Sequence, residues 1–247
     1  TMRLKGIFLL VIFQFASIAN GIEVMSIVLR RLLGLTDGAG ASDQSMLVIG
    51  AGFGRTGTES LCAALTRLGF KTYHGSKVAR YGHLPQWNRW FDAGDPAIFG
   101  SLRREGFNAT TDFPASVAHK ELLRRNPTAK VVLSLHPRGA EGWARSYQKT
   151  LVPLGDIFRR PPFKYFGIFK EYLKTEASVL SLMGIELEAA SGRPAFSQLV
   201  RSYEEWVALV KRSVPVDQLL MHTATDGYAP LSAFLGVAAP PDKDYPR

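Results

Sequence analysis

The segment MLVIGAGFGRTGTESLCAALTRLGF, residues 46–70, constrains the fold more than any other part of the chain. It has the pattern of a buried strand at Met46–Gly50, a glycine-rich turn, and a helix at Thr58–Leu68 whose apolar residues recur on one helix face. When a strand, a turn and a helix follow one another in this order, the free backbone N–H groups at the start of the helix and the positive end of its dipole meet at the turn. The sequence therefore predicts an anion site, and phosphate binding, between this strand and this helix.

The rest of the chain continues to alternate strands with helices. The further strands expected are Phe70–His74, Phe107–Thr111 (short), Lys130–Leu135 and Gln218–His222. The further helices expected are Pro85–Ala93, Pro114–Asn126, Ala140–Thr150, a long helical region from Tyr165 to Val214 broken near Gly192–Pro194, and Pro230–Leu235. Alternation of this kind is typical of βαβ units. We expect an α/β fold of the P-loop type over residues 46–247, with three α/β/α layers and a central parallel sheet.

The N-terminal segment has a different character. Arg3 and Lys5 precede an apolar run over residues 7–19, which is the layout of a signal sequence, and residues 22–35 are again mostly apolar. We expect residues 1–33 to form a signal or membrane-anchor segment and residues 34–45, rich in Gly, Ser and Asp, to form a linker. This predicts a membrane location in the secretory pathway or Golgi. The alternative, an N-terminal helix packed on a cytoplasmic domain, remains open.

The charge of the chain favours anionic ligands. Thirty Lys and Arg against 21 Asp and Glu give a net charge of +9, which attracts phosphate- or sulfate-bearing molecules. The basic residues are scattered and no nucleic-acid module is present, so we do not expect a nucleic-acid partner. The single cysteine, Cys62, cannot form an internal disulfide.

Two common phosphate loops fit the turn poorly. A nucleotide-hydrolysing loop, G-x-x-x-x-G-K-[ST], can be laid on residues 52–57, but Thr58 then stands in place of the lysine and Glu59 in place of the magnesium-binding hydroxyl. A dinucleotide fingerprint, G-x-G-x-x-G, fits the three glycines of the same stretch. The second strand, however, ends at His74 with no acidic residue to bind a ribose hydroxyl.

A third loop type fits better. Gly54-Arg55-Thr56-Gly57-Thr58 resembles the 5′-phosphosulfate loop of the P-loop sulfotransferases, and the longer string GRTGTESLCAALTRLGFKTYH is similar to a little-characterised subfamily of them. The resemblance implies 3′-phosphoadenosine-5′-phosphosulfate (PAPS) as donor, a hydroxyl or amine on a small molecule or glycan as acceptor, and no metal. It also implies that the Thr56, Gly57 and Thr58 amides hold the 5′-phosphate. Arg55 would neutralise charge on the departing bridging oxygen.

The same resemblance implies a second phosphate site. Strand Lys130–Leu135 leads into Arg138, and Ser146 follows eight residues later with Trp143 between them, as in the R-x4-W-x2-S variant of the subfamily. Arg138 and Ser146 would hold the 3′-phosphate, while Trp143 is expected in the core. His136-Pro137 departs from the commoner Arg-Asp-Pro form, and the family's R-K-G-x-x-G motif is absent near the C-terminus.

The general base is the remaining requirement. Where the broad family has His-x-Pro, the resembled subfamily has Asp-x-Pro, and this chain has Asp112-Phe113-Pro114. Asp112 is the candidate base; alternatively it caps the following helix, with Pro114 in the first turn. His74 would contact the acceptor or share base duty, or else be structural. Trp87 and Trp90 would line an acceptor pocket or, more typically for this spacing, belong to the core.

These observations predict a PAPS-dependent sulfotransferase. Two other readings stay open on the residues alone. One is a P-loop NTPase or kinase. The other is a non-catalytic, membrane-tethered relative that binds the nucleotide without turnover.

Overall fold

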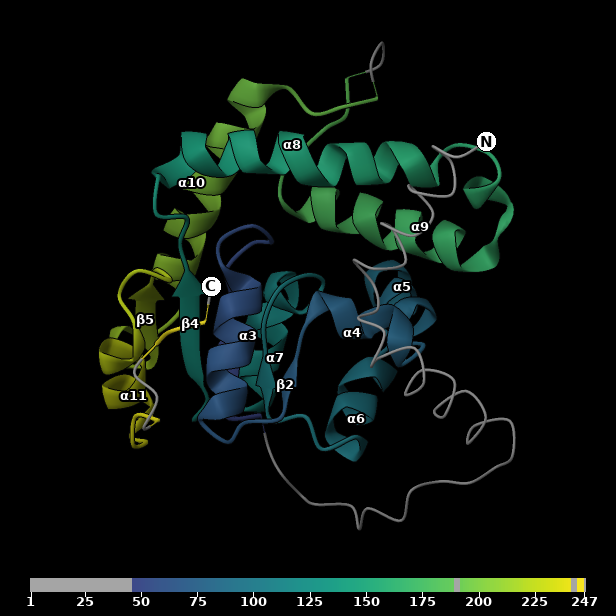
Figure 1. Ribbon diagram of the computed structural model, residues 1–247. Coiled ribbons are helices and arrows are strands. Elements are labelled where there is room, and N and C mark those ends of the chain that lie inside the picture. The colour runs from purple at the N-terminus through teal and green to yellow at the C-terminus, as the bar shows by residue number, and fades with distance from the viewer. Residues whose placement is uncertain (1–45, 189–191, 241–243, 247) are drawn as a thin grey trace. The chain divides into compact units, whose positions relative to one another are not determined.

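The computed structural model describes residues 46–188, 192–240 and 244–246, and these contain a five-stranded sheet in which every paired strand is parallel (Figure 1). In sheet order the strands are β2 (Thr72–Tyr73), β3 (Ala109–Thr110), β1 (Val48–Gly50), β4 (Lys130–Ser134) and β5 (Leu219–His222). The predicted α/β fold with a central parallel sheet is confirmed. Since β2 and β3 lie on one side of β1 while β4 and β5 lie on the other, the connections diverge at β1, where such sheets bind ligands.

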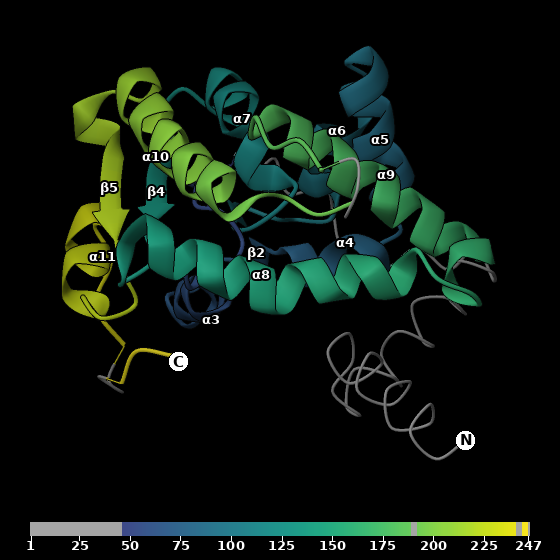
Figure 2. The same ribbon diagram turned by 90° about the horizontal axis from the view of Figure 1, so that it is seen from above.

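Side chains alternate across the sheet and so divide the core in two. Val48 of β1 packs with α3 (Thr58–Arg67) and α11 (Tyr228–Leu235) on one face. Its neighbour Ile49 packs into the larger cluster on the other face, where α7 (His119–Arg125) and α10 (Phe196–Ser213) lie (Figure 2). This period of two is expected of a strand that is buried on both faces. The three-layer arrangement follows from it.

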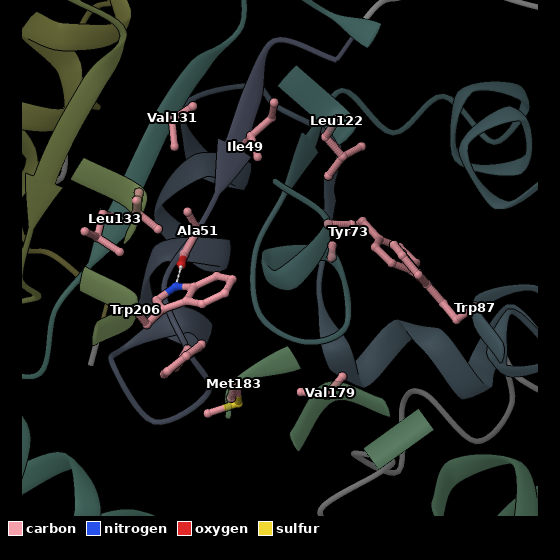
Figure 3. Packing of buried hydrophobic residues seen from close by; sticks show 14 of the residues in the cluster. Ile49, Ala51, Tyr73, Trp87, Leu122, Val131, Leu133, Val179, Met183 and Trp206 are labelled. Atoms are coloured by element: carbon pink, nitrogen blue, oxygen red, sulfur yellow. Dashed lines mark hydrogen bonds between the residues drawn. The ribbon is translucent and has the colours of Figure 1, made fainter. Parts of the chain in front are cut away.

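Three further helices lie between β2 and β3 in the chain. They are α4 (Gly75–Arg80), α5 (Leu84–Ala93) and α6 (Ala97–Arg104). Short 3₁₀ turns lie at Ala115–Ala118 (η1), Phe163–Tyr165 (η2) and Val216–Gln218 (η3). The larger cluster is centred on aromatic side chains, with Trp206 of α10 stacked on Phe53 at 4.8 Å between ring centroids. Figure 3 shows Trp206 beside the carboxyl end of β1.

Two long helices lie beyond the carboxyl ends of the strands. These are α8 (Gly139–Phe158) and α9 (Gly167–Leu182), and they run beside one another in Figures 1 and 2. The amino end of α8 follows β4 directly, so that its first turns stand beside the loop after β1. Parallel sheets place their chemistry at this edge, and α8 and α9 cover it.

The sequence predicted most elements but missed some. The expected helix over Ala140–Thr150 continues to Phe158 through Pro153, which is exposed on the helix surface while Gly155 and Phe158 beyond it are buried. Packing of that last turn outweighs the hydrogen bond that proline removes. The short helices α4 and α6 were not expected. The long helical region divides into α9 and α10, with the predicted break in the segment between them.

The predicted anchor, residues 1–33, and linker, residues 34–45, lie outside the described residues. Within the described ranges, no helix combines the length and the apolar character needed to span a bilayer.

Candidate functional site

Two buried tryptophans hold the loop that joins β1 to α3. Trp206 donates its indole N–H to the carbonyl oxygen of Ala51 at 2.8 Å, the bond drawn in Figure 3. Trp143 of α8 donates to the carbonyl oxygen of Gly54, also at 2.8 Å. Both carbonyls are thereby satisfied inside the core, where they do not repel an approaching anion. Trp143 is completely buried, which confirms its expected place in the core.

Thr56 points into the protein. Its hydroxyl lies 2.6 Å from the carbonyl oxygen of Phe53 and 2.7 Å from the hydroxyl of Ser134 at the end of β4. Its amide donates to the same Phe53 carbonyl at 3.2 Å. This differs from the expectation that the Thr56 amide contacts a 5′-phosphate, because a turn within the loop already uses that N–H group. Thr56 instead fixes the shape of the loop against β4.

The amides of Gly57 and Thr58 are open to a ligand. Gly57 is the N-cap of α3 and Thr58 its first residue, and neither amide donates a hydrogen bond within the described part of the chain. The first amides of a helix have no intrahelical partner, and the helix dipole adds positive potential at the same point. Of the three amides predicted to hold a 5′-phosphate, those of Gly57 and Thr58 are therefore open at the start of α3.

Arg55 and Ser146 meet although they stand far apart in the sequence. The Arg55 Nε lies 3.3 Å from the Ser146 hydroxyl oxygen and donates to it. Arg55 is exposed and has a φ of 73°, in the left-handed region that side chains other than glycine rarely adopt. No carboxylate within the described residues pairs with its guanidinium. The loop thus holds a strained, uncompensated cation next to α8.

Arg138 adds a second exposed cation, and His136 lies between it and Arg55 along the fold. Arg138 is exposed at the amino end of α8, and its amide donates to His136 Nδ1 at 3.1 Å. Burial lowers the pKa of His136, and the nearby guanidiniums of Arg138 and Arg55 lower it further. Each of these cations raises the free energy of protonating His136. An anion bound among the three side chains would relieve that repulsion.

His74 and Asp112 come together from neighbouring strands. His74 follows β2, Asp112 follows β3, and His74 Nε2 lies 3.3 Å from Asp112 Oδ2. His74 Nδ1 accepts the amide N–H of Ser76 at 3.1 Å and so caps α4. A neutral imidazole that accepts at Nδ1 carries its proton on Nε2, which faces the carboxylate. The sequence named both residues, and the structure brings them into one pair.

The two oxygens of the Asp112 carboxylate have different surroundings. A methyl group added to Gly75 would lie 2.4 Å from Oδ2, and one added to Gly54 would lie 3.0 Å from Oδ1. Oδ2 therefore lies on the His74 side, while Oδ1 lies beside the phosphate loop. A side chain at Gly75 would collide with the carboxylate and with the Phe113 carbonyl oxygen, and one at Gly54 would make tight contacts with the carboxylate and the Phe113 ring. Asp112 itself has a φ of 69°, which aspartate tolerates better than most residues.

The capping alternative for Asp112 is wrong. The turn that follows, η1, has Pro114 as its N-cap and no side-chain capping bond. Asp112 contributes only its backbone carbonyl, which accepts from the Ser116 amide at 2.9 Å. Its carboxylate is consequently directed at His74 and the loop, where it is available for chemistry.

The two tryptophans considered for an acceptor pocket, Trp87 and Trp90, have different surroundings. Trp87 is completely buried and donates its indole N–H to the Tyr73 hydroxyl at 3.1 Å, so its core role is confirmed. Trp90 lines an open groove of about 570 Å³ between α5 and α9, together with Phe91 and Leu182. None of the side chains that line this groove is a predicted site residue.

Some residues of the site were missed by the sequence reasoning. His136 was noted only as a departure from the usual loop, although its place directly after β4 was a usable signal. Tyr172 of α9 was also not considered; burial raises its pKa most, and Glu176, Tyr147 and Asp112 add to the rise in that order. No local pattern indicates that α9 folds over the sheet edge. Within the described residues, no cluster of three or more His, Cys, Asp or Glu side chains is arranged to hold a metal ion.

Two comparisons with known proteins each cover most of the chain. A family model described as a sulfotransferase domain matches residues 47–247. The chain is also 30% identical over 220 residues to "Ava biosynthesis cluster protein M" of Aspergillus versicolor, in an alignment that covers 82% of this chain and 80% of that protein. The family match contains every strand and helix from β1 to α11.

Proposed function

Because this chain belongs to the sulfotransferase family, we propose that it moves a sulfuryl group from PAPS to an acceptor hydroxyl or amine. One observation carries the proposal. The Asp112 carboxylate, paired with His74 at 3.3 Å, has its second oxygen beside Gly54 of the phosphate loop. A base and an anion cradle thus stand next to each other, as transfer between a bound donor and an acceptor requires.

The donor's 5′ end would bind at the start of α3. The amides of Gly57 and Thr58, with the positive end of the α3 dipole, would hold the 5′-phosphate. Thr56 would support them indirectly through its bonds to Phe53 and Ser134. Gly54 lets the Asp112 carboxylate and the Phe113 ring lie close to the loop, because a side chain at this position would meet both at 3.0 Å.

The donor's 3′-phosphate would bind at the amino half of α8. Arg138 offers an exposed guanidinium, and Ser146 offers a hydroxyl two helical turns further on. Both phosphate subsites are joined by the contact between Arg55 and Ser146. This geometry supports a single ligand that carries phosphate at both ends, and PAPS has that chemistry.

The transfer itself would run in line. The acceptor oxygen or nitrogen attacks the sulfur, and the bond from sulfur to the bridging oxygen of the 5′-phosphate breaks. The acceptor's proton passes to Asp112 Oδ1, while His74 Nε2 lies 3.3 Å from Oδ2 on the other side of the carboxylate. The Arg55 guanidinium neutralises the negative charge that develops on the bridging oxygen, so that adenosine 3′,5′-bisphosphate leaves. Catalysis rests on positioning and electrostatics.

His74 has a supporting role in this scheme. Its Nδ1 is engaged with the Ser76 amide and its Nε2 faces Asp112, so neither nitrogen is directed at an acceptor. This arrangement supports Asp112 as the group that takes the proton.

The acceptor and the location are proposed from the sequence and one relative. The relative's name assigns it to a biosynthesis cluster, which favours a small molecule over a glycan as acceptor for this chain. The apolar residues near the N-terminus would hold the enzyme on a membrane of the secretory pathway.

Ligand-induced stabilisation tests the donor assignment. The melting temperature of the full chain is measured with adenosine 3′,5′-bisphosphate, ATP or NAD, each with and without Mg²⁺. A ligand that binds only the folded state raises the melting temperature, and at equal concentration the tighter ligand raises it more, by an amount that grows with the logarithm of affinity. We expect the bisphosphate to stabilise most, without need of Mg²⁺. Stabilisation by ATP only when Mg²⁺ is present would indicate an NTPase or kinase instead.

A further inference from the structure

The connection between α8 and α9 exposes an unusual cluster of apolar side chains. We call residues 159–170 the aromatic tip. Within it Tyr165 is 67% exposed, Phe166 54% and Ile168 51%. Nowhere else in the described chain do three large hydrophobic side chains stand exposed within four consecutive positions. Clusters of this kind on a protein surface mark contact sites for membranes or other molecules.

The aromatic tip is an ordered part of the fold. Its inner side chains pack together, with Phe169 at 4.6 Å from Phe158 and 5.2 Å from Phe163 between ring centroids. The exposed side chains are therefore held outward by a packed aromatic base. Folding does not require Tyr165, Phe166 or Ile168 to be apolar, because none of them is buried.

The charge of the aromatic tip has one sign. Arg160, Lys164 and Lys170 are exposed, and residues 157–170 contain no acidic residue. Of the flanking acids, Asp156 pairs with Arg193 and Glu176 with Arg159, while Glu171 accepts from the uncharged Asn88 amide, each at 2.6 Å. Arg160, Lys164 and Lys170 therefore lie among the exposed aromatic side chains, and none of the three is paired with a carboxylate within the described residues.

The combination of exposed apolar side chains and cations in the aromatic tip fits some partners better than others. A second copy of the chain would set the same cations opposite each other across a two-fold axis, which is repulsive. A bilayer interface suits all of the side chains, since tyrosine and phenylalanine settle at the headgroup level while Lys and Arg contact lipid phosphates. Anionic lipid adds electrostatic attraction.

The aromatic tip is also remote from the nucleotide site. It lies at the opposite end of α8 from Arg138 (Figure 1), and a helix of 20 residues is about 30 Å long. Changes in the tip therefore leave the phosphate subsites in place.

We propose that the aromatic tip docks the sulfotransferase domain on an anionic bilayer surface, with Tyr165, Phe166 and Ile168 entering the headgroup region. Arg160, Lys164 and Lys170 bind the lipid phosphates there. This contact is independent of residues 1–33 and of the donor assignment. It would present the domain to acceptors at a membrane surface.

A local fluorescence measurement tests this in the full chain. Cys62 is the single cysteine, so Cys62→Ser with Tyr165→Cys allows one polarity-sensitive nitrobenzoxadiazole label at the tip. Val216→Cys in the same background is the matched control, because Val216 is 91% exposed and outside the tip. With vesicles of equal parts phosphatidylcholine and phosphatidylserine, we expect the fluorescence at position 165 to rise several-fold and that at 216 to stay unchanged. The local signal distinguishes tip docking from any binding by the N-terminal segment.

Three results would overturn the proposal. They are no rise at position 165, an equal rise at both positions, or a rise at 165 without lipid that accompanies dimerisation in light scattering. A polyglutamate peptide that raises the signal as far as vesicles do would point to an acidic protein partner instead. Replacing Arg160, Lys164 and Lys170 with glutamine should weaken the affinity for these vesicles by roughly 10²-fold, at about fivefold per cation. An unchanged response would remove the electrostatic part of the proposal.

Discussion

His74 Nε2 stands 3.3 Å from Asp112 Oδ2, joining the residues that follow two neighbouring strands into one acid–imidazole pair. The side chains are only 9% and 17% exposed, and the other His74 nitrogen is fixed by the Ser76 amide. Asp112 is thus oriented from one side and free toward the phosphate loop on the other. Its neighbour there is Gly54. In the proposed mechanism, Asp112 therefore takes the acceptor's proton and His74 has a supporting role.

Asp112→Asn should cut the rate of sulfuryl transfer by ~10²-fold or more while leaving the affinity for adenosine 3′,5′-bisphosphate unchanged. Asparagine has the same shape and tolerates the left-handed backbone at this position, but it cannot accept the acceptor's proton. Transfer rate, bisphosphate affinity and melting temperature are measured on the one variant. A near-normal transfer rate would exclude Asp112 as the base.

His74→Asn provides the companion measurement. An asparagine side chain can still accept the Ser76 amide and cap α4, but it cannot reach Asp112 as Nε2 does. We expect a loss of about tenfold in kcat, and little further loss when the change is added to Asp112→Asn, because the two residues act as a unit. Fully additive losses would separate their roles.

Arg138→Ala and Ser146→Ala should weaken the binding of adenosine 3′,5′-bisphosphate, by roughly ten- to hundredfold for the arginine. Adenosine 5′-phosphosulfate lacks the 3′-phosphate, so its affinity should hardly change. Arg145→Ala is the matched control on the same helix, because Arg145 is exposed and already paired with Glu141 at 2.6 Å. Equal losses for both nucleotides in calorimetry would show that the 3′ site lies elsewhere.

Arg55→Gly and Arg55→Ala should both lower kcat much more than nucleotide affinity, since the guanidinium is needed as the bridging oxygen departs. The two variants should differ in stability. Glycine adopts the φ of 73° without strain, whereas alanine does not. We expect Arg55→Gly to be more stable than Arg55→Ala by about 1 kcal/mol in denaturant unfolding. If the two are equally stable, the loop backbone differs from that described.

His119 should make the fold sensitive to mild acid. Burial lowers the pKa of His119 from 6.5 to about 4 in the folded protein, so only the unfolded chain takes up a proton in this interval. The free energy of unfolding therefore falls as pH drops from about 6.5 to about 4, by roughly 3 kcal/mol. His119→Gln should remove most of this slope, measured by urea unfolding across that range. An equally steep slope in the variant would assign it to other groups, such as His136, whose pKa is also lowered.

The local patterns of the sequence predicted the framework well. The strand, loop and helix at residues 46–68 are fixed by neighbouring residues alone, and the alternation that follows implies a parallel sheet. The short helix α4 escaped prediction because six residues have too few turns to show a periodic apolar face, whereas α6 buries Ile98, Phe99 and Leu102 on one face and could have been predicted. The end of α8 was misplaced because Pro153 normally stops a helix, whereas the buried Phe158 continues it.

The site was predictable only in part. Asp112 and His74 were identified separately, and their contact depends on β3 lying beside β2, an order that strand patterns do not specify. Ser146 was expected near a phosphate on the strength of its spacing from Arg138. That role stays a prediction; the structure adds a contact from Arg55, which is 91 positions away in the sequence. Contacts over such separations are set by how α8 packs across the sheet edge, and no local signal encodes that packing.

The most direct test of the account is to follow PAPS itself. The purified full chain is incubated with PAPS and a mixture of small hydroxyl- and amine-bearing acceptors, with a chelator present, and the products are identified by mass spectrometry. We expect adenosine 3′,5′-bisphosphate to form in equal amount to an acceptor that has gained one sulfuryl group, and to form ~10²-fold more slowly with Asp112→Asn. Turnover of ATP or GTP with Mg²⁺ while PAPS stays intact would contradict the account.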